Sequence, residues 1–173
     1  MKQLRLSGSG GQGVITAAII FAEAAIAEGK EAVQSQSYGP EARGGASKAE
    51  VIISDQQIYH PKVTCPDLVL AMTQKAADKY YHDLDQDGVL VLDEDLVPDV
   101  PDFANTLRVP ITRLAVEKIG NTLFANVVAL GVLVKLTGFV SLKAVQKSVA
   151  GRVPPATVEK NMQALQVGYD AVK

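Results

Sequence analysis

The chain has 173 residues, a length that suits one domain, so we expect residues 1–173 to fold as a single unit. It is 47% hydrophobic and 21% charged, with a net charge of −2 and no basic run, and this composition excludes nucleic acid as an expected partner. A single cysteine, Cys65, cannot form an internal disulfide, which favours the cytoplasm. It also excludes an iron–sulfur cluster held by this chain alone, because such clusters need several thiolates.

The apolar stretches are too short to span a bilayer. Residues 14–27 contain Glu23, and residues 124–136 include Lys135. The first residues, Met1 to Arg5, do not resemble a signal peptide. We therefore expect no membrane association and read both stretches as buried helices.

The chain in order alternates strands and helices before becoming helical. The pattern predicts strands at 3–6, 32–37, 47–54, 67–72, 88–93 and 106–109, with a short edge strand at 58–61 that Pro61 ends. It predicts helices at 14–28, 74–82, 112–118, 123–136, 142–149 and 156–172, with Thr73 and Ser141 as N-caps. This order predicts an α/β fold. We expect a three-layer domain with a mixed, mostly parallel sheet flanked by helices, a Rossmann-like glycine loop after strand one, and a helical C-terminal part.

A glycine-rich stretch, residues 7–13, lies between the first strand and the first helix. Its glycines have the spacing Gly8-x-Gly10-x-x-Gly13 of a dinucleotide fingerprint. Glycine lets a ligand approach the backbone, and the free N–H groups of the following helical turn favour an anion. The alternative is that the glycines only pack the helix close to the sheet. A nicotinamide site would also need a carboxylate at the end of the second strand, where Gln36 and Ser37 stand.

A second unusual loop, residues 38–46, joins the second strand to the third. It contains Pro40, three glycines, both signs of charge and Tyr38. Two strands joined by a loop, rather than by a helix, indicate a mixed sheet. If the first two strands are parallel neighbours, both loops lie at the same edge of the sheet, where open α/β folds bind ligands.

The two loops together resemble the gamma subunit of the 2-oxoacid:ferredoxin (flavodoxin) oxidoreductases. The resemblance rests on residues 6–14 (LSGSGGQGV) and 35–47 (SQSYGPEARGGAS), and it is greatest for the 2-oxoglutarate type. It extends over nearly the whole chain through residues 49–54 (AEVIIS), 65–67 (CPD) and 125–131 (ANVVALG).

The resemblance implies a subunit that takes part in catalysis without holding the reacting groups. The complete enzymes convert a 2-oxoacid and coenzyme A to acyl-coenzyme A and carbon dioxide, and they reduce ferredoxin. Coenzyme A would be a substrate that this chain helps to bind. Thiamine diphosphate, magnesium and iron–sulfur clusters would lie on alpha, beta and ferredoxin-like delta subunits. The chain would also complete the active-site region, and it could form a homodimer in isolation.

The residues assigned to coenzyme A are those of the glycine loop and one arginine. No catalytic residue and no metal ligand is assigned. The expected ligand contacts are Gly8, Ser9, Gly10, Gly11, Gln12, Gly13 and Arg43.

The remaining candidates have structural interpretations. Arg43 could instead pair with a carboxylate of this chain or of a partner. We expect Cys65 to be a buried small hydrophobe, and His60 and His82 to be surface residues. Asn126 lies in an apolar helix, so its amide should find a partner, such as the backbone of a neighbouring loop or subunit.

Two other functions fit part of the sequence. One is a subunit of an indolepyruvate:ferredoxin oxidoreductase, which carries similar glycine segments. The other is a stand-alone module that binds NAD or FAD, which the missing carboxylate disfavours.

Overall fold

The computed structural model describes residues 1–37 and 45–173. The strands are β1 (Lys2–Ser9), β2 (Glu31–Gln36), β3 (Ala46–Ser54), β4 (Leu68–Ala71), β5 (Val89–Asp93) and β6 (Thr106–Val109). The α-helices are α1 (Val14–Ala27), α2 (Gln74–Tyr80), α3 (Ile111–Leu114), α4 (Ala125–Thr137), α5 (Leu142–Arg152) and α6 (Val158–Asp170). Shorter helical turns are η2 (Ala115–Ile119), η3 (Thr122–Phe124) and η4 (Pro155–Thr157).

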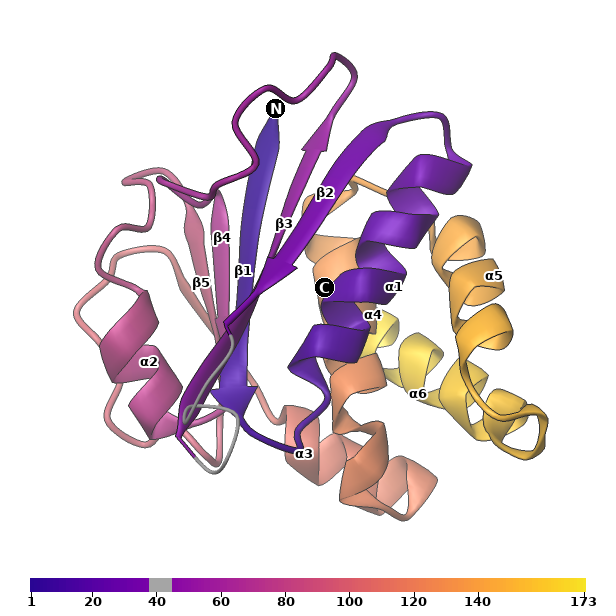
Figure 1. Cartoon of the computed structure of the whole chain (residues 1–173). Coiled ribbons are helices and arrows are strands. Elements are labelled where there is room, and N and C mark those ends of the chain that lie inside the picture. The colour runs from indigo at the N-terminus through magenta and orange to yellow at the C-terminus, as the bar shows by residue number, and fades with distance from the viewer. Residues whose placement is uncertain (38–44) are drawn as a thin grey trace.

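The strands form one sheet in the order β2-β3-β1-β4-β5-β6 (Figure 1). β3 is antiparallel to both of its neighbours, while β1, β4, β5 and β6 pair in parallel. The predicted mixed, mostly parallel sheet is therefore confirmed. The first two strands are not neighbours, however, because β3 lies between them. Both are antiparallel to β3, so they still end at the same edge of the sheet, the lower one in Figure 1.

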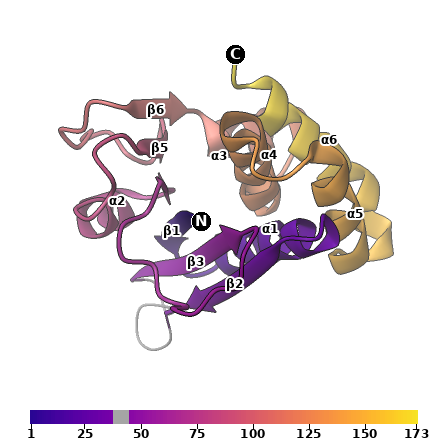
Figure 2. The same cartoon turned by 90° about the horizontal axis from the view of Figure 1, so that it is seen from above.

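Helices cover the two faces of the sheet unequally (Figures 1 and 2). α1, α4, α5 and α6 lie on one face and α2 lies on the other. Leu4 and Leu6 of β1 join the large core under α1. Val69 and Ala71 of β4 belong to the smaller core under α2. Alternate residues along a strand thus serve different cores, as the two-residue period of a strand requires.

Three local predictions about the elements changed. No strand forms at 58–61, because Tyr59 and His60 are exposed and the segment buries too little apolar surface to hold a strand. The helix expected at 112–118 is the short α3, which continues as the π-helical turn η2. The long apolar helix begins with a 3₁₀ turn, η3, capped by Asn121, before α4 proper. The predicted caps Thr73 and Ser141 are confirmed.

α4 and α6 cross at two glycines, Gly131 and Gly168. A Cβ on Gly168 would lie 1.8 Å from the carbonyl oxygen of Val128, and one on Gly131 would lie 2.1 Å from that of Leu165. The two backbones are therefore in direct contact, with no room for a methyl group at the crossing.

A buried ion cluster joins β1, β3 and α2. Arg5 is 4% exposed, and its Nε donates to Oε1 of Glu50 at 2.8 Å; Glu50 is itself 6% exposed. The guanidinium also makes a two-pronged contact with Asp83, including Nη2 to Oδ2 at 2.9 Å, and donates to the carbonyl oxygen of Tyr80 at 3.0 Å. Lys48 Nζ donates to Glu50 at 3.0 Å. The cluster thus holds the end of α2 against the sheet.

The contribution of this cluster should appear in the pH dependence of the free energy of unfolding. Hydrogen bonds from Arg5 lower the pKa of Asp83. A carboxylate with a lowered folded pKa stabilises the protein above its unfolded pKa, about 3.9, and this contribution is lost as the pH falls through the folded value. We therefore expect Asp83→Asn to be less stable than the unmodified chain at pH 7. The difference should shrink below about pH 4. Urea unfolding between pH 3 and 7 measures it, and a difference independent of pH would contradict the assignment.

Candidate functional site

The glycine-rich loop runs from the end of β1 to the first turn of α1. Gly11 and Gly13 have φ angles of 89° and 76°, in the region that favours glycine. Gly13 is the N-cap residue of α1, and no side chain caps that end of the helix. The predicted order of strand, glycine loop and helix is present, but β1 continues to Ser9, so Gly8 and Ser9, which were expected in the loop, lie in the strand.

Gln12 braces the loop from inside. Its Oε1 accepts from the Ser9 amide at 2.7 Å, and its Nε2 donates to the carbonyl oxygen of Met72, which follows β4, at 3.3 Å. A Cβ on Gly8 would lie 2.4 Å from the same Oε1, so Gly8 leaves room for this side chain. The Gln12 amide therefore positions the loop, and direct contact with a ligand stays a prediction for it.

The first turn of α1 offers unpaired donors. In the described chain, the amide groups of Val14, Ile15 and Thr16 have no hydrogen-bond acceptor, whereas the Ala17 amide donates to the carbonyl oxygen of Gly13 at 3.0 Å. Three free N–H groups at the positive end of a fourteen-residue helix favour an anion.

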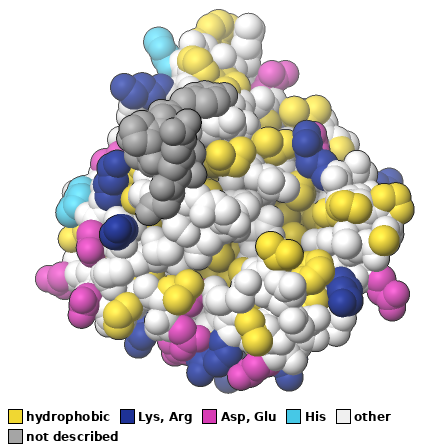
Figure 3. Space-filling model, turned by 60° about the horizontal axis from the view of Figure 1, so that its bottom comes forward, with side chains coloured by type: hydrophobic (Ala, Val, Ile, Leu, Met, Phe, Trp, Pro, Cys, Tyr) yellow, Lys and Arg dark blue, Asp and Glu magenta, His cyan; other side chains and the backbone are white. Residues whose placement is uncertain are grey.

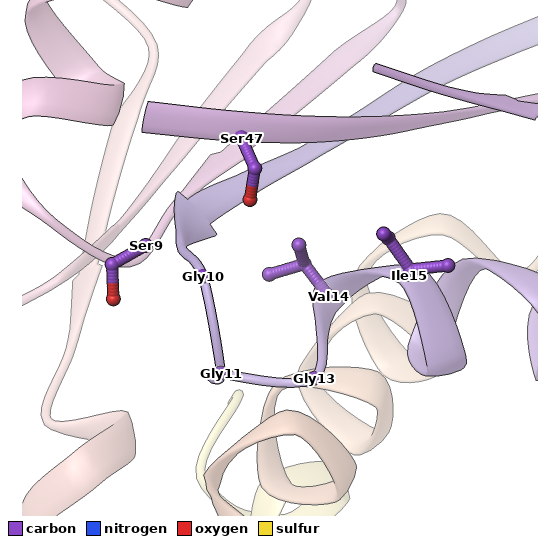
Figure 4. A pocket seen from close by; sticks show the side chains of 7 residues that line it. All are labelled: Ser9, Gly10, Gly11, Gly13, Val14, Ile15 and Ser47. Atoms are coloured by element: carbon purple, nitrogen blue, oxygen red, sulfur yellow. The ribbon is translucent and has the colours of Figure 1, made fainter. Parts of the chain in front are cut away.

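These donors border a cavity of about 230 Å³ (Figure 4). Figure 4 shows the side chains of Val14 and Ser47 converging on it, while the side chain of Ser9 points to the other side of the strand. The lining residues are Ser9, Gly10, Gly11, Gly13, Val14, Ile15 and Ser47. The cavity is smaller than the roughly 300–1,000 Å³ of ordinary small-molecule sites, so it suits one group of a ligand.

Three lining residues were not among the predicted contacts: Val14 and Ile15, which directly follow the glycine loop, and Ser47 on β3. Ser47 is the one that lies far from the loop in the sequence. It lies opposite Gly8 in the register of β1 and β3, and its Oγ donates to the Gly8 carbonyl at 3.4 Å. An antiparallel pairing of the third strand with the first would have placed it there. Periodicity alone does not specify which strand pairs with which.

The predicted site residues divide into two groups. Gly8 to Gly13 come together around the loop and its cavity, with Gly10, Gly11 and Gly13 lining the cavity directly. Arg43 lies outside the described residues, as does Tyr38. The described ends of the second loop are nearby: Ala46 is opposite Ser9, and the Ser37 amide donates to Lys48 O at 3.0 Å.

Predictions for four other polar residues had mixed outcomes. Asn126 does find a backbone partner, because its Nδ2 donates to the Gly13 carbonyl at 3.2 Å. Both His60 and His82 are exposed, as predicted. The prediction for Cys65 was wrong, because the thiol is exposed and lies 3.5 Å from Asp85. Desolvation and this carboxylate raise the pKa of Cys65, which disfavours a nucleophilic thiolate.

Apolar side chains gather at the end of the molecule that holds the glycine loop (Figure 3). Leu123 on η3 is 75% exposed and Val116 on η2 is 47% exposed. Both turns precede α4, whose first turn contacts Gly13. An apolar surface beside a small open cavity is typical of a face that contacts another protein.

Residues 1–37 and 45–173 contain neither a membrane-spanning helix nor a cluster of metal-binding side chains. No helix there is long and apolar enough to cross a membrane. No group of three or more His, Cys, Asp or Glu side chains in the same residues could hold a metal ion.

Comparisons with known proteins agree over the full chain. The profile of the family described as pyruvate ferredoxin/flavodoxin oxidoreductase matches residues 3–171. The 2-oxoglutarate synthase subunit KorC of Methanocaldococcus jannaschii is 48% identical, over 99% of this chain and 94% of that protein. The crystal structure of a keto/oxoacid ferredoxin oxidoreductase gamma subunit from Geobacter sulfurreducens is 51% identical, with a TM-score of 0.89 over 99% of this chain and 98% of that one.

A third likeness, at 22% identity, concerns the fold alone. It is a 2-oxoglutarate:ferredoxin oxidoreductase from Magnetococcus marinus, solved with 2-oxoglutarate, coenzyme A and succinyl-coenzyme A bound. The TM-score is 0.86, and the match covers 98% of this chain and 30% of that one.

Proposed function

We propose that this chain, which belongs to the pyruvate ferredoxin/flavodoxin oxidoreductase family, is the gamma subunit of a 2-oxoglutarate:ferredoxin oxidoreductase. The assembled enzyme converts 2-oxoglutarate and coenzyme A to succinyl-coenzyme A and carbon dioxide, and two electrons pass to ferredoxin. The observation that carries the substrate assignment is the identity of 46–48%, over nearly full length, to three 2-oxoglutarate synthase KorC subunits. Pyruvate synthase subunits are less similar, at 31%.

In this proposal the glycine loop binds coenzyme A through a phosphate group. The free amides of Val14, Ile15 and Thr16 suit an anion, and the cavity beside them is of a size for one phosphate rather than a whole cofactor. Coenzyme A is present in the Magnetococcus enzyme, which shares this fold. Arg43, at the second loop, is a further candidate for an anion contact.

Partner subunits supply the rest of the active site. One cysteine does not fit an iron–sulfur cluster, and the sequence has no Gly-Asp-Gly motif for magnesium and thiamine diphosphate. The clusters, the metal and the thiamine cofactor therefore belong to alpha, beta and ferredoxin-like delta subunits. The exposed Leu123 and Val116 beside the loop fit a surface that such a subunit covers.

The competing function as a stand-alone NAD or FAD module is disfavoured. β2 ends at Gln36, so the position of the ribose-binding carboxylate holds an amide. A subunit of an indolepyruvate oxidoreductase stays the second candidate, and activity of the complex with indolepyruvate would favour it.

Isothermal titration of coenzyme A into the co-expressed complex tests the proposal. We expect Gly11→Asp to abolish measurable binding, because it places a carboxylate beside the free amides. Gly29→Asp is a matched control: both glycines are exposed, have φ near +80 to +90° and would place a Cβ in open space. Gly29 follows α1 at the far end of the helix, so its variant should bind normally. Equal affinity in both variants would show that coenzyme A binds elsewhere.

A further inference from the structure

Asn126 is a polar residue on the first turn of an otherwise apolar helix. The four residues after it, Val127 to Leu130, are all buried in the core. Its side chain is half-buried and reaches across 113 residues of sequence to donate Nδ2 to the Gly13 carbonyl at 3.2 Å. The loop bond therefore uses the polar start of a helix whose residues 127–134 are all buried.

The contact is fitted to glycine at position 13. A Cβ there would lie 2.6 Å from Nδ2 and 2.9 Å from Cγ of Asn126. Gly13 also adopts the left-handed backbone conformation, and no side chain caps the start of α1. Asn126 is thus a side chain from outside the loop that contacts the N-cap residue of the helix, whereas Gln12 holds the loop itself through Ser9 and Met72.

The bond to the Gly13 carbonyl has a consequence for the next amide. The Gly13 carbonyl and the Val14 N–H belong to one planar trans peptide, so they point in opposite directions. The Gly13 carbonyl accepts two hydrogen bonds, one from the Ala17 amide of α1 at 3.0 Å and one from Asn126 Nδ2. The bond from Ala17 sets the carbonyl along the helix, and the bond from Asn126 is a second restraint that keeps the Val14 N–H turned the other way, towards the cavity that Val14 lines. Figure 4 shows α4 on the opposite side of Gly13 from Val14 and Ser47.

We infer that Asn126 is a positioning residue for the anion site: it holds the Gly13–Val14 peptide so that the Val14 amide faces the bound phosphate. The inference rests on the proposed binding of coenzyme A at the loop. Asn126 itself lies behind the peptide and does not touch the ligand.

A double-mutant cycle in the assembled complex tests this role. Val14→Pro removes the amide hydrogen, and proline is tolerated at the first position of a helix. We expect Val14→Pro and Asn126→Ala each to raise the dissociation constant of coenzyme A about tenfold, the effect of one charge-assisted hydrogen bond. Because both changes act on the same amide, the double variant should also show about tenfold.

The control for a merely structural role is Asn161→Ala. Asn161 is a buried asparagine on α6 that donates to the backbone carbonyl of Thr157 at 2.9 Å. The Asn161→Ala variant loses a side-chain-to-backbone hydrogen bond that lies away from the glycine loop. The complex that contains it should therefore bind coenzyme A with unchanged affinity. In steady-state assays, Asn126→Ala should raise KM for coenzyme A and leave KM for 2-oxoglutarate unchanged. Asn126→Ser, too short to reach Gly13, replaces the alanine variant if that complex does not assemble.

Three outcomes would overturn the inference. If the double variant weakens binding about a hundredfold, the two residues act independently. If Asn126→Ala binds normally while Val14→Pro and Gly11→Asp do not, the anion site is real and Asn126 does not position it. If neither Val14→Pro nor Gly11→Asp alters binding, coenzyme A does not use the loop, and the proposed binding site fails together with the inference.

Discussion

Replacing Gly168 by alanine should lower the free energy of unfolding by at least about 3 kcal/mol, the upper part of the range for overpacked cores. The new methyl group would lie 1.8 Å from the carbonyl oxygen of Val128 and 2.7 Å from its carbonyl carbon. Both atoms are backbone of α4, so no side-chain rotation relieves the clash. α4 and α6 must separate, and the apolar contacts between them are lost along with the fit at Gly131.

Gly151→Ala provides the matched control for this substitution. Gly151 also lies within a helix, α5, but a Cβ there meets no atom within 4 Å. Alanine should therefore stabilise α5 by up to about 1 kcal/mol, because glycine has the lower helix propensity. Urea unfolding of the two variants should move the midpoint in opposite directions. A small loss for Gly168→Ala would mean that the helices slide apart easily and that the crossing does not require glycine.

The sequence predicted where the strands and helices lie better than it predicted which strands pair with one another. Six apolar runs became the six strands because alternation and burial are local properties. The order of strands was not predictable in this way: β3 inserts between β1 and β2, which sets Ser47 opposite Gly8. The strand predicted at 58–61 did not form, because a short apolar pattern without a partner strand is not stable as a strand.

The candidate site was predictable where one stretch of chain builds it. The spacing of the glycines indicated the turn itself, and Gly11 and Gly13 do adopt positive φ angles. The contacts that hold the loop from elsewhere, from Ser47, Met72 and Asn126, were not predictable from that stretch. Asn126 stood out because a polar residue in an apolar helix needs a partner, although the partner itself was not evident. Arg5 gave no such signal. It alternates with Leu4 and Leu6, a pattern typical of a strand with one solvent-exposed face, and only the docking of α2 buries it.

Arg5→Met should cost about 3 kcal/mol of unfolding free energy, because it removes one partner of a buried ion pair. Among the described residues, Glu50, which is 6% exposed, would keep only Lys48 as a charged partner. Asp83 would lose its contact too, but its carboxylate is 46% exposed and can be hydrated. The loss should therefore exceed that of Asp83→Asn at pH 7. Urea unfolding of both variants measures the difference.

The double variant Arg5→Met/Glu50→Leu distinguishes two costs: the loss of the attraction within the ion pair, and the burial of one charge that is left without its partner. Replacing a buried ion pair by apolar side chains of similar size is often neutral or stabilising, whereas removal of one partner is costly. We expect the double variant to be more stable than either Arg5→Met or Glu50→Leu alone, with Lys48 and Asp83 turning to solvent. Additive losses would instead mean that the cluster contributes through its hydrogen bonds to α2, such as the one to the Tyr80 carbonyl. Because neither Arg5 nor Glu50 lines the cavity at the glycine loop, the folded double variant should bind coenzyme A with unchanged affinity in the complex. Unchanged affinity would show that the buried ion cluster contributes to the stability of the fold and not to ligand binding.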